Sequence, residues 1–224
     1  MIKKIIGKVY KKIFVGLKRL VIHFLYFNFL TKAKNKKVSF SNIENVLIIA
    51  HPDDEMIFFH KFLAENKKTL VICLTNGGCK IRSNEFYNSI NYYGVKGIMF
   101  NFKDGNNIIW NSVIIKRQLL KILNQINFSV VLTHNKEGEY GHKQHIQCFL
   151  LLKDIKYLLS SSVVFLTPDN NLSIFKKKNK LTELQLNEKI TAFKNIYKSQ
   201  SKLILNKDFV FYNYFVYENL IKKM

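Results

Sequence analysis

The chain has 224 residues, 48% of them hydrophobic, and carries a formal net charge of +21 from 36 Lys and Arg against 15 Asp and Glu. This length fits one domain with a short extension, and the two prolines and nine glycines exclude a collagen-like or largely disordered chain. Three irregularly spaced cysteines exclude a disulfide framework or a zinc knuckle, so a reducing cytosol is expected. We expect Cys73 and Cys148 to be buried and Cys79 to lie in a loop.

The N-terminal 37 residues form a basic extension. Eleven Lys and Arg and no Asp or Glu lie within residues 1–43. Apolar residues at three- and four-residue steps over residues 1–30 predict an amphipathic helix. Its longest apolar stretch, eleven residues over 20–30, is shorter than the ~20 needed to span a bilayer. This pattern favours a helix lying on an anionic membrane surface, at the inner face of the membrane; the alternative is a helix docked on the domain or on a second subunit.

Strand-like and helix-like runs then alternate through residues 38–224, which we expect to form one domain. The expected strands are residues 46–50, 69–75, 97–102, 129–134, 162–167 and 209–217. The expected helices are residues 53–66, 82–93, 111–124, 142–159 and 181–197. Apolar strands separated by helices predict an α/β, Rossmann-like fold with a mostly parallel sheet and helices on both faces.

Two polar clusters follow strands of this predicted sheet. The first, residues 51–55, reads His-Pro-Asp-Asp-Glu directly after the first strand, and the second, residues 141–145, reads Gly-His-Lys-Gln-His after the fourth. In open α/β sheets, sites form beyond the carboxyl ends of the strands. We therefore expect the two clusters to meet at one edge of the sheet.

These residue types suit a metal-dependent hydrolase. His51, Asp54 and His145 provide two imidazoles and a carboxylate, a ligand set typical of catalytic Zn²⁺, with Fe²⁺ as an alternative ion. Asp53 remains beside the ion as a candidate general base and then acid. His142 lies one helical turn before His145 and could donate a hydrogen bond to an oxyanion.

Other interpretations of the same residues stay open. Asp53 or Asp54 could simply cap a helix, although two adjacent acids facing a histidine pair make pure capping a poor explanation. Glu55 is expected to orient a neighbouring group or accept from backbone N–H groups. His134 is either a supporting residue of the site or an ordinary strand terminus.

Two other functions fit single features of the chain. Two histidines and one carboxylate also describe a non-haem iron oxygenase, whose usual scaffold is a β-sandwich rather than a parallel sheet. The net charge suits a nucleic-acid-binding protein. The sequence contains no helix-turn-helix, zinc-finger or RNA-recognition signature, so no nucleic-acid partner is expected.

The two clusters resemble the PIG-L/LmbE-like metal-dependent de-N-acetylases. The resemblance continues through Thr75-Asn76-Gly77-Gly78, Arg82, Glu85, Gly94-Val95 and Asp104-Gly105 to Tyr197-Lys198-Ser199-Gln200, and covers roughly residues 44–201. One departure is that many members carry an acid shortly before the second histidine motif and another within it, where this chain has Lys143-Gln144. Glu139 could take the place of such an acid as the partner of His142.

This resemblance implies a function and further site residues. It implies zinc held by His51, Asp54 and His145, with Asp53 and His142 catalytic. It adds Arg82 and Asp104 as substrate-binding residues. The implied substrate is an N-acetylglucosamine-type sugar joined to a lipid or another aglycone, which is hydrolysed to acetate and a free amine.

Overall fold

The structure is a computed structural model that describes residues 38–160, 162–168, 180–202 and 221–223, together with Tyr214 and Val216. The helix predicted over residues 1–37 lies outside the described residues. Among the helices that are described, none has the length and apolar character needed to cross a bilayer.

A six-stranded sheet forms the centre of the molecule, in the order β3-β2-β1-β4-β5-β6. Its strands are β1 Asn45–Ile49, β2 Thr69–Thr75, β3 Lys96–Phe102, β4 Val130–Thr133, β5 Val164–Pro168 and β6 Ile221–Lys223. The first five are parallel, and β6 pairs with β5 in the antiparallel direction. The predicted Rossmann-like, mostly parallel α/β fold is therefore confirmed.

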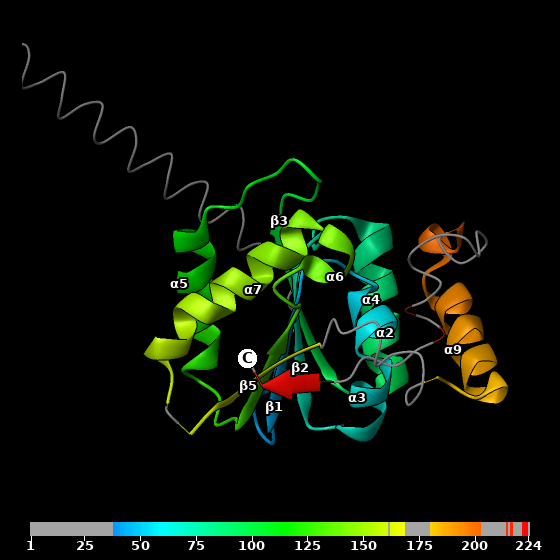
Figure 1. The fold of residues 1–224 in the computed structure, drawn as a ribbon, viewed down its shortest axis with the longest axis horizontal. Coiled ribbons are helices and arrows are strands. Elements are labelled where there is room, and N and C mark those ends of the chain that lie inside the picture. Colours follow the sequence, from blue (N-terminus) through cyan, green and yellow to red (C-terminus); the bar gives the residue numbers. More distant parts are fainter. Residues whose placement is uncertain are drawn as a thin grey trace, which may run out of the picture.

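Helices cover both faces of this sheet (Figure 1). Helices α5 Ser112–Leu123 and α7 Lys143–Ile155 lie on one face, and α2 Asp54–Phe58, α3 His60–Glu65, α4 Lys80–Tyr93 and α9 Glu183–Ile196 lie on the other. Alternate residues of β1 serve the two layers: Val46 and Ile48 pack under α5 and α7, while Leu47 and Ile49 pack under α2 to α4. Because both faces are buried, the strand is a continuous apolar run.

Local sequence accounts for most helix boundaries. Asn111 caps α5 by accepting a hydrogen bond from the Ile114 N–H, and Thr182 forms a capping box with Gln185 at the start of α9. Helix α4 ends at Gly94, whose φ of 67° is easily adopted by glycine.

The structure divides two of the predicted helices. The helix expected over residues 53–66 breaks at Phe59, which has φ −128°, so that α2 and α3 are separate and both Phe58 and Phe59 are buried. Helix α7 ends at Ile155, and the next three residues form the 3-10 helix η1, Lys156–Leu158. Periodicity alone did not predict either change; the break at Phe59 accompanies burial of Phe58 and Phe59, whereas η1 buries none of its residues.

The strand predicted over residues 209–217 is the clearest error. Most of that segment lies outside the described residues, but Tyr214 and Val216 are helical, and the last strand is β6. The Tyr214 ring packs 5.0 Å from the Phe58 ring, and its carbonyl accepts a hydrogen bond from the Lys189 Nζ. Tyr214 therefore joins the core beside α2 rather than a sheet ladder.

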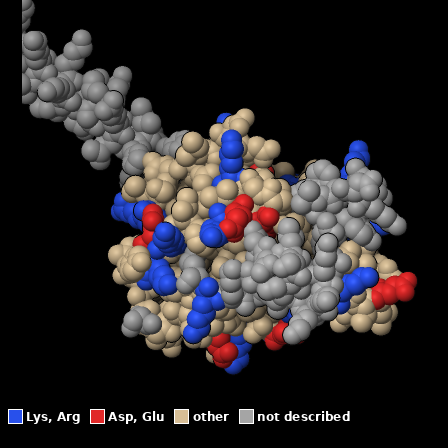
Figure 2. Space-filling view, in the orientation of Figure 1, with Lys and Arg blue, Asp and Glu red and all other residues tan. Residues whose placement is uncertain are grey.

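The strand order identifies where a site should form. The chain runs outward from β1 to β2 and β3, and then returns to β4 on the other side of β1. The crevice between the carboxyl ends of β1 and β4 is the topological switch point, where open α/β sheets bind their ligands. On the face of the molecule shown in Figure 2, the described surface carries scattered Lys and Arg and fewer Asp and Glu.

Candidate metal centre and active site

The turn after β1 has an unusual backbone conformation. Asp53 has φ 113° and ψ −29°, which a non-glycine residue rarely adopts. Asp53 precedes α2 without a side-chain capping bond, and the Asp54 carboxylate instead accepts from the His51 N–H at 2.7 Å. Pure helix capping therefore does not explain this pair of acids. Such strained residues are concentrated at functional sites.

The buried carboxylate of Glu55 stabilises this turn. Its Oε2 accepts the Asp53 N–H at 3.1 Å, and its Oε1 accepts the hydroxyls of Ser89, at 2.5 Å, and of Tyr197. Glu55 is completely buried. The expectation that Glu55 accepts from backbone donors is confirmed, whereas its partners on α4 and beyond α9 were not predicted.

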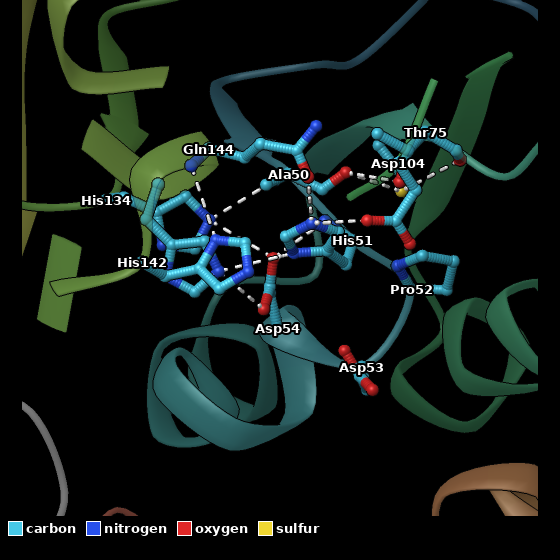
Figure 3. Close-up of polar contacts among 12 residues, drawn as sticks. Ala50, His51, Pro52, Asp53, Asp54, Thr75, Asp104, His134, His142 and Gln144 are labelled. Atoms are coloured by element: carbon cyan, nitrogen blue, oxygen red, sulfur yellow. Dashed lines mark hydrogen bonds and ion pairs between the residues drawn. The ribbon is translucent and has the colours of Figure 1, made fainter. Parts of the chain in front are cut away.

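The three predicted metal ligands lie together at the switch point, where Figure 3 shows His51 and Asp54 side by side. The distance from His51 Nδ1 to His145 Nε2 is 3.3 Å. Asp54 Oδ2 lies 3.4 Å from His51 Nδ1, and Asp54 Oδ1 lies 3.3 Å from His145 Nε2. The turn after β1 and the start of α7 thus bring together side chains that are far apart in the sequence.

Each pair of these residues has a separation that suits tetrahedral coordination. Ligand atoms about 2.1 Å from a central ion are about 3.4 Å from one another in a tetrahedron, and each of the three separations is close to this value, with Asp54 facing His51 through Oδ2 and His145 through Oδ1. The neighbouring ligand atoms form two overlapping groups that share His145, one with His51 and His142 and the other with Asp54 and His134. Two imidazoles and one carboxylate leave room for a further ligand, as in catalytic zinc sites.

A second layer of hydrogen bonds orients His145. Glu139 Oε2 accepts from the Nδ1 of His145 at 2.7 Å and from the Nδ1 of His134 at 3.0 Å, and its Oε1 accepts the Asn135 N–H at 3.0 Å. Burial favours the neutral acid, but His134 and His145 outweigh it and lower the pKa of Glu139 to about 2. Donation from Nδ1 leaves the His145 Nε2 lone pair facing the ligand cluster.

Glu139 therefore supports His145 and His134 rather than His142, its expected partner. A short turn, α6 Gly138–Gly141, presents it with φ 58°, and glycines with positive φ lie on either side. His134 is a supporting residue of the site, since its Nε2 also accepts the Ala50 N–H at 3.2 Å.

His51 is oriented through its other nitrogen. His51 Nε2 lies 2.7 Å from Gln144 Oε1 and 3.3 Å from Asp104 Oδ1. The hydrogen bond from His51 lowers the pKa of Asp104 to about 2. Asp104, expected at the substrate, thus also contacts a proposed metal ligand. The sequence did not single out Gln144, which is fully buried in α7.

Asp53 lies apart from the His51 and Asp54 contacts in Figure 3, and its carboxylate pairs with Arg82. Arg82 Nη2 donates to Asp53 Oδ2 at 2.9 Å and to the Pro52 carbonyl, and its Nη1 donates to Glu85 at 2.8 Å and to Ser199 at 3.2 Å. Burial raises the pKa of Asp53 to about 7, although Arg82 opposes this shift. A carboxyl with such a pKa can both accept and return a proton near neutral pH.

His142 caps α7 and faces His51, with ring centroids 4.7 Å apart. Its Nδ1 accepts the Gln144 N–H at 3.3 Å, so a neutral ring carries its proton on Nε2. Burial and the nearby His145 and His51 lower the pKa of His142 to about 4, which favours this neutral form.

A pocket of about 220 Å³ opens over these groups. Its lining combines the predicted site residues with three others: His51, Asp53, Asp54, Arg82, Asp104 and His142, with Ile57, Tyr140 and Gln200. Buried His145 lies beneath it. The pocket volume is below the range of about 300–1,000 Å³ common for drug-sized ligands, so it suits one ring-sized group.

The three cysteines are where they were expected. Cys73 and Cys148 are buried and Cys79 is exposed in the loop before α4. His60 of α3 pairs through Nδ1 with the Tyr93 hydroxyl at 2.7 Å. None of these four residues lines the pocket.

Comparison with known structures supports the fold. A diacetylchitobiose deacetylase from Pyrococcus horikoshii is 15% identical with a TM-score of 0.54, over 90% of this chain and 92% of that one. A 4-carboxy-2-hydroxymuconate hydratase from Pseudomonas putida is 12% identical with a TM-score of 0.55, over 81% and 96%. Since a deacetylase and a hydratase share the fold, the fold alone does not identify the reaction.

Sequence comparison identifies the family. Uncharacterized protein L374 of Acanthamoeba polyphaga mimivirus is 35% identical over 179 residues, 72% of this chain and 73% of that protein. A probable N-acetylglucosaminyl-phosphatidylinositol de-N-acetylase of Dictyostelium discoideum is 31% identical over 124 residues, which cover 49% of this chain and about half, 48%, of that enzyme. The family model described as PIG-L, GlcNAc-PI de-N-acetylase, matches residues 46–156. The chain therefore belongs to the PIG-L family of de-N-acetylases.

Proposed function

We propose that this protein is a metal-dependent hydrolase that removes the acetyl group from an N-acetylglucosamine-type sugar in a glycolipid, a polysaccharide precursor or another conjugate. The observation that carries the proposal is the cluster of His51, Asp54 and His145, which lie 3.3–3.4 Å from one another in pairs, at a pocket lined by His51, Asp54 and Asp53. Membership of the PIG-L family supports the reaction type, and the named relative supports an N-acetylglucosamine substrate.

The proposed resident ion is Zn²⁺, with Fe²⁺ as the alternative, held by the two imidazoles and the Asp54 carboxylate. When bound, it would act as a Lewis acid toward the acetamide and water. Ion identity can be measured by elemental analysis of protein purified with and without oxygen. Stoichiometric iron in the anaerobic preparation, in place of zinc, would contradict the zinc assignment.

The chain's own residues supply proton transfer and charge stabilisation. Asp53 takes a proton from the attacking water as the water oxygen bonds to the acetamide carbon. Asp53 later returns that proton to the amine nitrogen as the C–N bond breaks. The products are acetate and a free amino sugar. His142 donates its Nε2 proton in a hydrogen bond to the oxyanion that forms on attack.

Arg82 and Asp104 are the proposed substrate-binding residues at the pocket rim. The Arg82 side chain is 13% exposed and is already bound to Asp53. Arg82 therefore contacts substrate through the edge of its guanidinium group that lines the pocket. Asp104 is 43% exposed and can accept a sugar hydroxyl.

Acetate release from N-acetylhexosamine conjugates tests this function. We expect activity that a chelator abolishes and a divalent ion restores, together with loss of activity in Asp53→Asn and His145→Ala. Retention of full activity in the chelated protein or in both variants would refute the mechanism.

We further propose that residues 1–30 hold the protein on an anionic membrane surface on the cytoplasmic side, near a lipid-linked substrate. The separation of seven basic residues from an apolar helical stripe within residues 1–30 supports this location. Flotation with anionic vesicles should decrease when Ile13 and Leu17 are both replaced by Asp. Undiminished flotation of that variant would contradict this attachment.

A further inference from the structure

Three exposed apolar side chains lie in the loop before α5, on α5 and on α7, and two of them, Ile109 and Leu150, line a groove. Ile109 is 88% exposed, Val113 69% and Leu150 49%; we call these three residues the α5–α7 patch. The groove has a volume of about 330 Å³, and Trp110 and Leu151 contribute to its lining. A single exposed apolar residue is ordinary, but two that line one groove, with a third exposed on the adjoining helix α5, indicate an interaction surface.

The loop before α5 connects this patch to the active site. Gln144, which contacts His51, donates to the Lys103 carbonyl at 2.9 Å and accepts the Gly105 N–H at 3.3 Å. One turn further along α7, Gln147 accepts the Trp110 N–H at 2.8 Å and donates to the Ile108 carbonyl at 3.1 Å. In Figure 1, α7 runs from beside α6 towards α5. A ligand seated on the patch would therefore lie beside the pocket.

The charge around the patch favours an anionic partner. Residues 103–160 contain eight Lys and Arg and four Asp and Glu, and one of those acids, Glu139, is buried. Over α5 and α7, Lys and Arg side chains lie around uncharged surface (Figure 2). Lys116 of α5 pairs with Asp154 of α7 at 2.9 Å, which partly neutralises the acid closest to the groove. Two copies of such a basic face would repel each other, whereas anionic lipid would neutralise it.

We propose that the α5–α7 patch docks on a bilayer containing anionic phospholipid, with Ile109, Val113 and Leu150 inserted at the level of the headgroups. This inference builds on the proposed lipid-linked substrate, because docking here would place the pocket beside the sugar of a membrane-held glycolipid. Apolar side chains on one face with lysines around them are typical of interfacial membrane binding.

Trp110 provides a direct probe, because it is the single tryptophan of the chain and lies in the groove. Full-length protein is mixed with vesicles of phosphatidylcholine and phosphatidylserine whose acyl chains carry bromine, a fluorescence quencher. We expect quenching of Trp110 fluorescence with these vesicles and little quenching with phosphatidylcholine alone. Vesicles that bind the protein without quenching Trp110 would show attachment elsewhere, and would overturn the proposal.

Matched variants separate this surface from general hydrophobicity. Ile109→Asn with Leu150→Asn should weaken vesicle partitioning, measured by the quenching titration, by about tenfold or more. The control Ile81→Asn with Leu184→Asn changes side chains that are also well exposed, at 63% and 69%, on α4 and α9, and should leave it unchanged. Equal quenching of all three proteins would refute the docking surface.

Two further measurements distinguish lipid docking from a dimer interface and from a defect in the active site. Gel filtration should show the same oligomeric state for both double variants, and a dimer that only Ile109→Asn with Leu150→Asn dissociates would assign the patch to a second copy instead. Acetate release from a water-soluble conjugate should be equal in both variants. Quenching is measured without turnover. A protein that shows Trp110 quenching but no deacetylase activity would therefore refute the proposed function and leave the docking surface supported.

Discussion

Replacing Glu139 by Gln tests whether buried hydrogen bonds set the affinity of the proposed metal centre. The Glu139 side chain is 0% exposed, and its contacts are all with donors: the Asn135 N–H on one oxygen, and His134 and His145 on the other. Glutamine has nearly the same shape but only one acceptor oxygen. Its NH₂ group must face either the Asn135 N–H or both imidazoles, so at least one buried donor loses its partner.

The expected effect can be estimated from this geometry. Losing one buried hydrogen bond to a charged acceptor reduces the free energy of unfolding by about 1.5–3 kcal/mol. When the bond to His145 is the one lost, its Nδ1 proton is no longer fixed, and its Nε2 lone pair is no longer held toward His51 and Asp54. Removing a supporting partner of a metal-binding histidine lowers metal affinity by about 10–100-fold.

Two measurements check this reasoning. A competitive zinc titration gives the dissociation constant, and urea unfolding of the metal-free protein gives the free energy of unfolding. Glu137→Gln is the matched control, because the Glu137 side chain is 47% exposed and pairs with Lys136 at the surface. If Glu139→Gln bound zinc as tightly as the wild-type protein and unfolded at the same urea concentration, Glu139 would not have the role that its contacts indicate.

Three further substitutions test other parts of the site and fold. Asp53→Asn tolerates a positive φ but cannot accept a proton, so we expect acetate release about 10²–10⁴-fold slower with unchanged zinc binding; an active variant would exclude Asp53 as the base. Tyr197→Phe removes a donor to buried Glu55 and should lower the urea-derived free energy of unfolding by about 1–3 kcal/mol, whereas Tyr157→Phe, at a site 84% exposed, should have no effect. Equal urea midpoints for Tyr197→Phe and Tyr157→Phe would contradict this difference. Gly97→Ala places a Cβ 2.7 Å from the Ile90 side chain and should lower the free energy of unfolding by about 1–3 kcal/mol; an unchanged thermal midpoint would show that α4 can move away.

The fold class and the position of the site could be predicted from the amino-acid sequence. Apolar strands that alternate with helical runs predicted the parallel sheet, because burial of both strand faces leaves a signal in local composition. Since parallel strands end at a common edge, the motifs beginning at His51 and Gly141 were predicted to meet there. The 3.3 Å between His51 Nδ1 and His145 Nε2 agrees with that expectation.

The side chains that support the cluster of His51, Asp54 and His145, in contrast, depend on how the helices pack. The bond from Tyr197 to Glu55 joins residues 142 positions apart, and Glu139 pairs with His145 rather than with His142, which is nearer in the chain. Gln144 lies inside the second histidine motif, yet its contact with His51 depends on how α7 meets the turn after β1. Such bonds leave no periodic signal in the sequence, because their geometry exists only after the helices have packed on the sheet.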